Sequence, residues 1–174
     1  MGNQKITVWA DPGKTTGIAS WDSRYQVFTS LEISNDLKAV GHWVELLTQL
    51  NSQRMISDEH GNRNEFRIEI GWERYIVTPG GIRHGTPYWS LETIGILKYL
   101  ALKYDLTILP PQLSSMMSVI PDEKLKKLSW YKPGKPHAND ASRHLARYML
   151  KTDSLPVGIR DKISGNEIDP GRLA

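Results

Sequence analysis

Three acidic residues stand where side chains from distant parts of the chain could do chemistry together. Asp11 ends an apolar, β-branched run just before the turn pair Pro12-Gly13, and Glu73 ends a second apolar run. Asp140 lies in the first turn of a helix expected to start near His137. Convergent carboxylates hold hard cations through their oxygens. Two Mg²⁺ ions about 4 Å apart promote in-line hydrolysis of a phosphodiester.

Each of these acids also fits a purely structural role. Asp is a favoured turn residue, Glu is common at solvent-facing strand ends, and an acid in the first turn of a helix is stabilised by the helix dipole. His137 and Asp140 are three residues apart on a helix, so they project together. A chemical role requires that the three acids lie close together in the fold. Whether they do depends on the arrangement of the strands and the helix that carry them.

The hydrophobic pattern predicts an α/β protein with element order β-β-β-α-β-α-β, followed by shorter helices. The expected strands cover residues 6–11, 18–21, 26–32, 66–73 and 106–109, and the expected helices cover 36–50, 89–104, pieces of 112–128, and 137–150. In this order the first strand lies beside the fourth, with both carboxyl ends at one edge. The last helix can then place its first turn across that edge.

Composition sets the class of protein. The chain has 174 residues, of which 39% are hydrophobic and 24% charged, as expected for a soluble globular protein with one main domain. It contains no Cys, which excludes a disulfide framework, a thiol nucleophile and a Cys-based zinc site. We find no apolar run of membrane-spanning length and no signal-peptide pattern, so we expect a cytoplasmic protein without membrane contact.

Positive charge is concentrated near the C-terminal end. The chain has a net charge of +3, whereas the segment 120–151 alone carries +5, beside Trp130 and Tyr131. A local basic field with aromatic neighbours is typical of a surface that binds a phosphate backbone. A solvated helical face has the same composition, and the sequence leaves both interpretations open.

Three motifs together resemble the RuvC-like Holliday-junction resolvases of the RNase H-like superfamily, most closely their bacteriophage branch. The motifs are Trp9-Ala10-Asp11-Pro12-Gly13-Lys14-Thr15-Thr16-Gly17, Ile70-Gly71-Trp72-Glu73-Arg74 and His137-Ala138-Asn139-Asp140-Ala141. The resemblance covers roughly residues 5–150 and implies a five-stranded mixed sheet in the order 3-2-1-4-5, flanked by helices. Residues 1–150 would form the nuclease domain, and 151–174 a tail that is flexible or docked on a partner.

The resemblance also implies an activity. We expect a metal-dependent endonuclease of DNA recombination and repair that resolves four-way junctions by paired symmetric cuts, leaving 5′-phosphates. A phage-encoded enzyme of this kind would act in the cytoplasm of the host cell. Asp11, Glu73, His137 and Asp140 would hold two Mg²⁺ ions per site. Many RuvC-like proteins have Asp where this chain has His137, so Mn²⁺ can substitute or His137 can act as a proton shuttle.

Residues around this expected site would contact DNA. They are Arg74, Tyr75, Arg83, Lys132 and Lys135. Tyr75 directly follows the Glu73-Arg74 pair and is placed to stack on an unpaired base. The expected helix 89–104 carries more apolar residues than one sheet face needs, with Leu91, Ile94 and Leu102 off its main stripe. It is the expected interface of a symmetric homodimer.

Other interpretations of the same residues are weaker. Gly13-Lys14-Thr15 is not a P-loop, because Val8 stands where that motif needs Gly. A phosphate loop of the actin and sugar-kinase type would need two such domains, which 174 residues cannot supply. The open alternatives are a structure-selective nuclease on flaps or replication forks and a junction-binding protein that does not cut.

Overall fold

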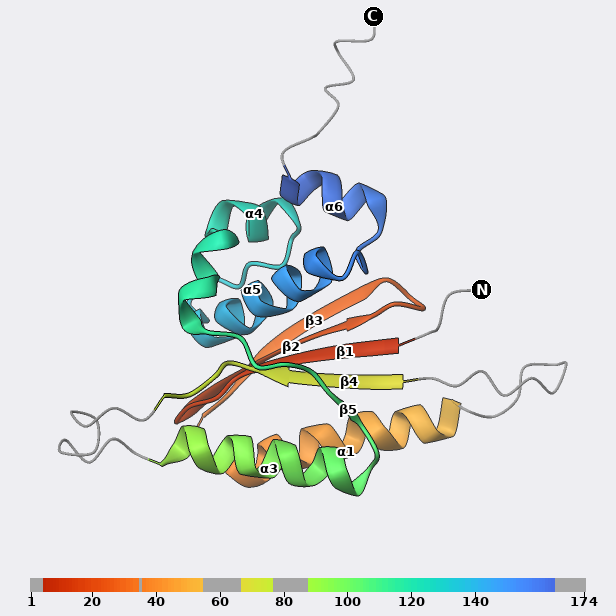
Figure 1. Ribbon diagram of the computed structural model, residues 1–174, viewed down its shortest axis with the longest axis vertical. Coiled ribbons are helices and arrows are strands. Elements are labelled where there is room, and N and C mark those ends of the chain that lie inside the picture. The colour runs from red at the N-terminus through yellow and green to blue at the C-terminus, as the bar shows by residue number, and fades with distance from the viewer. Residues whose placement is uncertain (1–4, 35, 55–66, 77–87, 165–174) are drawn as a thin grey trace, which may run out of the picture.

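The first strand forms the centre of a five-stranded mixed sheet (Figure 1). The computed structural model describes residues 5–34, 36–54, 67–76 and 88–164. The strands are β1 (Lys5–Asp11), β2 (Thr15–Asp22), β3 (Val27–Ser34), β4 (Arg67–Trp72) and β5 (Thr107–Ile108). They are ordered β3-β2-β1-β4-β5. The β3-β2-β1 pairs are antiparallel, and β4 is parallel to both β1 and β5.

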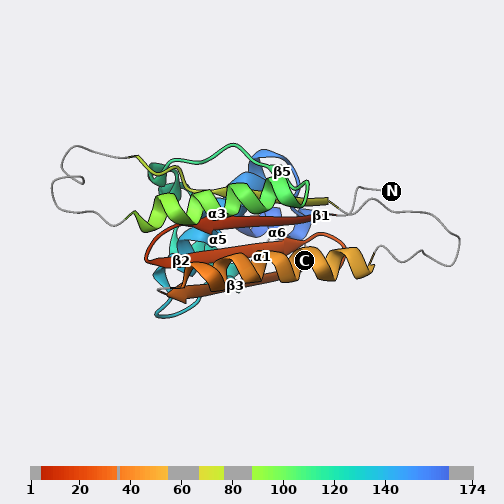
Figure 2. The same ribbon diagram turned by 90° about the horizontal axis from the view of Figure 1, so that it is seen from below.

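Helices cover both faces of this sheet, as Figures 1 and 2 show. On one face lie α1 (Leu37–Arg54) and α3 (Trp89–Lys103). On the other lie α4 (Asp122–Lys127), α5 (Pro136–Lys151) and α6 (Val157–Ser164), with a 3-10 turn η1 (Ser114–Val119) beside α5. The predicted fold class, an α/β protein with a 3-2-1-4-5 mixed sheet flanked by helices, is confirmed.

Successive side chains of β1 point to opposite faces of the sheet, so this strand contributes to the core on both faces. Trp9 faces α5 and packs with Leu145 and Met149, whereas Val8 and Ala10 face α1 and α3. Because helices cover both faces, every residue from Ile6 to Ala10 is buried. The central strand is therefore packed on both faces, and this packing fixes the position of the Asp11 backbone at its end.

Two details of the prediction are wrong. The sequence predicts a buried strand near residues 106–109, but β5 is an edge strand and both Thr107 and Ile108 are exposed. The sequence also predicts a flexible or docked tail after residue 150, but Leu155 and Ile163 are buried in the core cluster that contains Leu125 of α4 and Met149 of α5. The chain from 152 to 164 is thus an integral part of the α5 layer, and residues 165–174 lie outside the described residues.

The remaining boundaries agree closely with expectation. Helix α1 begins after Asp36, whose Oδ1 accepts a hydrogen bond from the Ala39 N–H at 2.8 Å, and it continues to Arg54 rather than to residue 50. Residues 77–87, which follow the fourth strand and include Arg83, lie outside the described residues. Among the helices that are described, none is both long and apolar enough to cross a membrane.

Candidate active site

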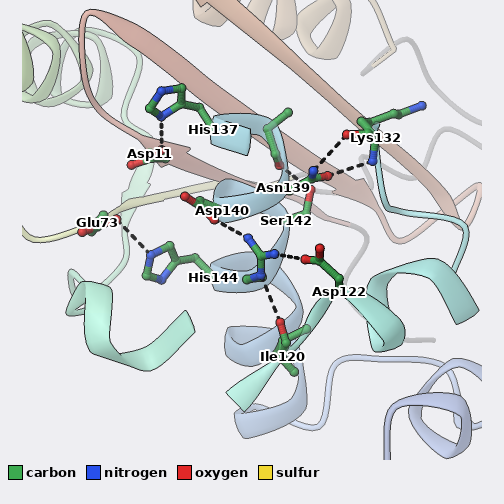
Figure 3. A network of polar contacts seen from close by, with 12 residues as sticks. Asp11, Glu73, Ile120, Asp122, Lys132, His137, Asn139, Asp140, Ser142 and His144 are labelled. Carbon is green, nitrogen blue, oxygen red and sulfur yellow. Dashed lines mark hydrogen bonds and ion pairs between the residues drawn. The ribbon is translucent and has the colours of Figure 1, made fainter. Parts of the chain in front are cut away.

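Asp11 and Glu73 lie side by side at the carboxyl ends of two neighbouring parallel strands (Figure 3). The backbone N–H of Glu73 donates to the Ala10 carbonyl at 3.0 Å, which extends the β1-β4 pairing to the residue before Asp11. Both side chains are largely shielded, with 13% of Asp11 and 18% of Glu73 exposed. The predicted meeting of these two acids is what the strand register produces.

The first turn of α5 lies directly against this edge of the sheet. Gly17 pairs with Asp11 across β1 and β2, and a Cβ added to Gly17 would stand only 1.9 Å from the carbonyl oxygen of His137. A side chain at this position would therefore push the helix away. The absence of one lets the α5 backbone approach β2 closely enough for the His137 ring to reach Asp11.

Each acid of the site faces a basic side chain from α5 (Figure 3). Nδ1 of His137 lies 2.8 Å from Oδ2 of Asp11, and Nε2 of His144 lies 3.3 Å from Oε2 of Glu73. Asp140 accepts a hydrogen bond from Arg143, which also bonds Asp122. Residues 137, 140 and 144 are spaced by three and four, so they share one face of α5.

His144 is the most deeply buried member of the group. Its side chain is fully buried, and its ring stacks on Trp9 with 5.9 Å between centroids. Its Nδ1 lies 3.2 Å from Oε1 of Gln112, and Nε2 of Gln112 donates to the His144 carbonyl at 3.1 Å. Gln112 also forms the β-bridge to Glu73, so these three residues are mutually fixed.

Burial and charge act differently on the three acids. Burial is the largest cause that raises the pKa of Asp11 from 3.8 to about 7; Glu73 contributes in the same direction, and the His137 hydrogen bond opposes it. Burial also raises the pKa of Asp140, against the opposing effect of Arg143. Burial is the largest single effect on Glu73 and favours a higher pKa, but the hydrogen bond with His144, the charge of His144 and further hydrogen bonds together outweigh it and lower that pKa.

This concentration of acids fits a divalent cation chemically. A buried carboxylate whose pKa is raised by burial and by a neighbouring negative charge gains most from a bound positive ion. The oxygen donors of Asp11, Glu73 and Asp140 are the kind that Mg²⁺ prefers. In the conformation described for residues 5–34, 36–54, 67–76 and 88–164, no group of three or more His, Cys, Asp and Glu side chains is arranged to hold an ion.

The residues expected to contact DNA are placed unevenly. Arg74, Lys132 and Lys135 are exposed, whereas Tyr75 is half-buried and packs against the core between the sheet, α1 and α3. Arg83 lies outside the described residues. The Lys132 backbone is fixed by Asn139, which bonds both its N–H and its carbonyl, at 2.8 and 2.9 Å.

Sequence reasoning missed four residues of this constellation. They are Glu32, Gln112, Arg143 and His144. The spacing of His144 from His137 and Asp140 was an available signal, because a helix places all three on one face. Glu32 gave no such signal, since only the register of β3 brings it to α5.

A scan against protein-family models gives no match for this chain, and a search of curated proteins finds no significant one. The function must therefore be inferred from the three motifs, the sheet order and the geometry of the site.

Proposed function

We propose that this protein is a metal-dependent endonuclease that cleaves branched DNA, as the RuvC-like Holliday-junction resolvases do. One observation carries the proposal: Asp11 and Glu73 stand at adjacent carboxyl ends of parallel strands, with His137 and Asp140 brought over them by the first turn of α5. If each acid served only its own turn or helix cap, the three acids would have no reason to lie together at one edge of the sheet.

Asp11, Glu73 and Asp140 would hold two Mg²⁺ ions, with Mn²⁺ as a substitute, and His137 would either complete this ligand set or move a proton. When bound, such ions supply positive charge to the scissile phosphate and to the departing oxygen. Asp140 would have to exchange its bond with Arg143 for that role. Nη1 of Arg143 would then be available to a phosphate oxygen, while the rest of the guanidinium would still bond Asp122 and the Ile120 carbonyl.

His137 is placed to move a proton. Its Nδ1 is held by Asp11 at 2.8 Å and 44% of its side chain is exposed, so Nε2 can receive the proton of an attacking water. The water oxygen forms a bond to phosphorus while the bond from phosphorus to the 3′ oxygen breaks. The products are a 5′-phosphate and a 3′-hydroxyl, whose proton comes from solvent.

Cations around the site suit a DNA substrate. Arg74, Lys132 and Lys135 are exposed; Arg74 directly follows Glu73, and the two lysines belong to the segment 120–151, which carries a net charge of +5. Contacts of these side chains with phosphates would make DNA binding strongly salt-dependent. Tyr75 is half-buried, so stacking on an unpaired base would use only its exposed part.

A symmetric homodimer would give the paired cuts that a four-way junction requires. Helix α3 supports this proposal, because Leu91, Tyr99 and Leu102 are 40%, 62% and 79% exposed on its outer surface. Ile94, expected to belong to this surface, is instead buried at 8% exposed. The absence of Cys suits the reducing cytoplasm in which such an enzyme would meet DNA.

The test is a panel of end-labelled substrates with Mg²⁺, Mn²⁺ or EDTA. The panel holds a four-way junction, a flap, a replication fork and linear duplex. The proposal expects metal-dependent cuts in branched DNA at two symmetric positions of the junction, and little cutting of linear duplex. Single cuts in flaps or forks alone would favour the structure-selective nuclease. Tight binding of the junction without cleavage in either metal would establish a non-cutting binder.

A further inference from the structure

A carboxylate outside the proposed metal ligands holds the first turn of α5. Glu32, on β3, is a largely buried acid with 9% of its side chain exposed. Its Oε1 accepts hydrogen bonds from the backbone N–H of His137 at 2.9 Å and of Ala138 at 3.3 Å. Its Oε2 lies 3.6 Å from Nζ of Lys135. The acid thus bonds the residue that carries the proposed proton-transfer group.

Helix α5 takes this cap from a distant strand. The first N–H groups of a helix need acceptors from outside it, and the residue at the N-cap position here is Lys135, whose ammonium group only donates. Glu32 supplies the acceptor, and the positive end of the helix dipole favours its charge. A local Ser or Asp would have capped the helix equally well, but it would not have tied the helix to the sheet.

The sheet register fixes His137 at three points. Asp11, Gly17 and Glu32 lie in one row across β1, β2 and β3. In this row Glu32 accepts the N–H of His137, Gly17 lies against its carbonyl, and Asp11 meets its ring. One row of paired residues therefore sets both the backbone and the imidazole of His137.

From this arrangement we infer that Glu32 is a positioning residue, which keeps the imidazole of His137 on Asp11. The inference rests on the proposed function, because it assumes that His137 takes part in the reaction. Displacement of a reacting group by about 1 Å costs up to roughly 100-fold in rate. Loss of Glu32 should therefore lower the rate of cleavage while leaving DNA binding nearly unchanged.

Kinetics of a double-mutant cycle test the inference. Glu32→Ala should lower kcat about 10- to 100-fold, with KM changed less than about threefold, and Glu32→Gln, which keeps an acceptor oxygen, should recover most of the loss. In a His137→Ala background, Glu32→Ala should cause no further loss. The same fold-loss in both backgrounds would overturn the inference, because it would mean that Glu32 acts on the fold in general.

A matched control separates positioning from helix capping. Asp36 caps α1 through the N–H of Ala39, and α1 lies on the opposite face of the sheet from α5, so Asp36→Ala removes the cap of a helix that does not carry His137. We expect Asp36→Ala to lower the unfolding temperature but to keep kcat within about twofold. A loss of kcat as large as that of Glu32→Ala would overturn the inference.

Nuclear magnetic resonance gives a readout that does not need cleavage. The Hε1–Cε1 signal of His137 should shift on Asp11→Asn substitution in the parent protein, and Glu32→Ala should abolish that sensitivity. An unchanged response in folded Glu32→Ala would overturn the inference even if the protein cuts DNA. If the parent cuts no DNA while Glu32→Ala abolishes the response, only the proposed function fails, because Glu32 would still be the residue that holds His137 on Asp11.

Discussion

Nδ1 of His137 lies 2.8 Å from Oδ2 of Asp11, although 126 residues separate them in the sequence. The contact joins the end of the central strand to the first turn of the longest helix on that face of the sheet. It exists because the α5 backbone approaches β2 at a glycine and is held from β3 by a carboxylate. Each part of this arrangement can be tested separately by substitution.

The ionised carboxylate of Asp11 should lower the stability of the metal-free protein at pH values above the pKa of Asp11. Since burial raises that pKa from 3.8 to about 7, the folded protein keeps a proton between these values that the unfolded chain has lost. The contribution of Asp11 to stability therefore falls as pH rises from about 4 to 7. Asp11→Asn removes the buried charge and should raise the free energy of unfolding by about 1–3 kcal/mol at pH 8 in EDTA.

Urea denaturation at pH 5 and pH 8 measures this effect. Asp36→Asn is a suitable control, because Asn caps a helix as well as Asp does and Asp36 is exposed. The control should change stability by less than about 0.5 kcal/mol at either pH. A variant Asp11→Asn that is less stable than the parent at pH 8 would contradict the account of an unfavourable buried charge.

Gly17 should tolerate no side chain. A Cβ there would meet the His137 carbonyl oxygen at 1.9 Å, so Gly17→Ala must displace α5 and should cost about 1–3 kcal/mol or more of stability. Gly158→Ala is the matched control, because within the described residues a Cβ on Gly158 has no heavy atom within 4 Å. Thermal unfolding of both variants measures this difference in stability. Equal unfolding temperatures for the two would show that α5 is not held tightly against β2.

His137→Asp should remain active and shift the metal preference toward Mg²⁺. A carboxylate oxygen is a harder ligand than an imidazole nitrogen, so the ratio of cleavage rates in Mg²⁺ and Mn²⁺ should rise. His137→Ala should lose about 100-fold or more in either metal, as expected for a group that moves a proton. If His137→Ala cuts as fast as the parent with both ions, the residue serves only to begin the helix.

Helix α3 should form the dimer interface. Leu102 is 79% exposed at its outer surface, and Leu102→Lys should convert a micromolar dimer to a monomer. Val157, which is 64% exposed on α6, provides the control Val157→Lys, which should leave the dimer intact. Sedimentation velocity with and without junction DNA measures both. A parent protein that is strictly monomeric in both conditions would exclude the paired-cut mechanism.

Much of this site could be predicted from the sequence because its acids end regular elements. The β-branched run before Asp11 and the alternation before Glu73 identify the strands, and the helical spacing after His137 identifies α5. The buried partner His144 was missed, although it stands seven residues after His137 and four after Asp140. That spacing alone predicts a shared helix face, so no tertiary information was needed to find it.

Other features depend on tertiary contacts that no local pattern specifies. Glu32 reaches His137 only because the pairing of β3 with β2 puts it opposite Gly17. The segment around α6 is rich in polar residues, Gly and Pro, so its composition resembles that of a tail. Yet Leu155 and Ile163 are buried in one core cluster with residues of α4 and α5, and this burial anchors the segment. The apolar character of β5 predicts burial, whereas its position at the sheet edge leaves it exposed.

The most direct test of the central claim is cleavage of a labelled four-way junction by Asp11→Asn, measured beside its affinity for the same junction. Loss of this carboxylate removes a proposed metal ligand and one negative charge facing the DNA. We predict that cleavage in Mg²⁺ and Mn²⁺ falls at least about 1,000-fold, while binding in EDTA stays equal or becomes tighter. Cleavage near the parent rate, or equal loss of cleavage and binding, would contradict the claim that Asp11 is the centre of a metal-dependent nuclease site.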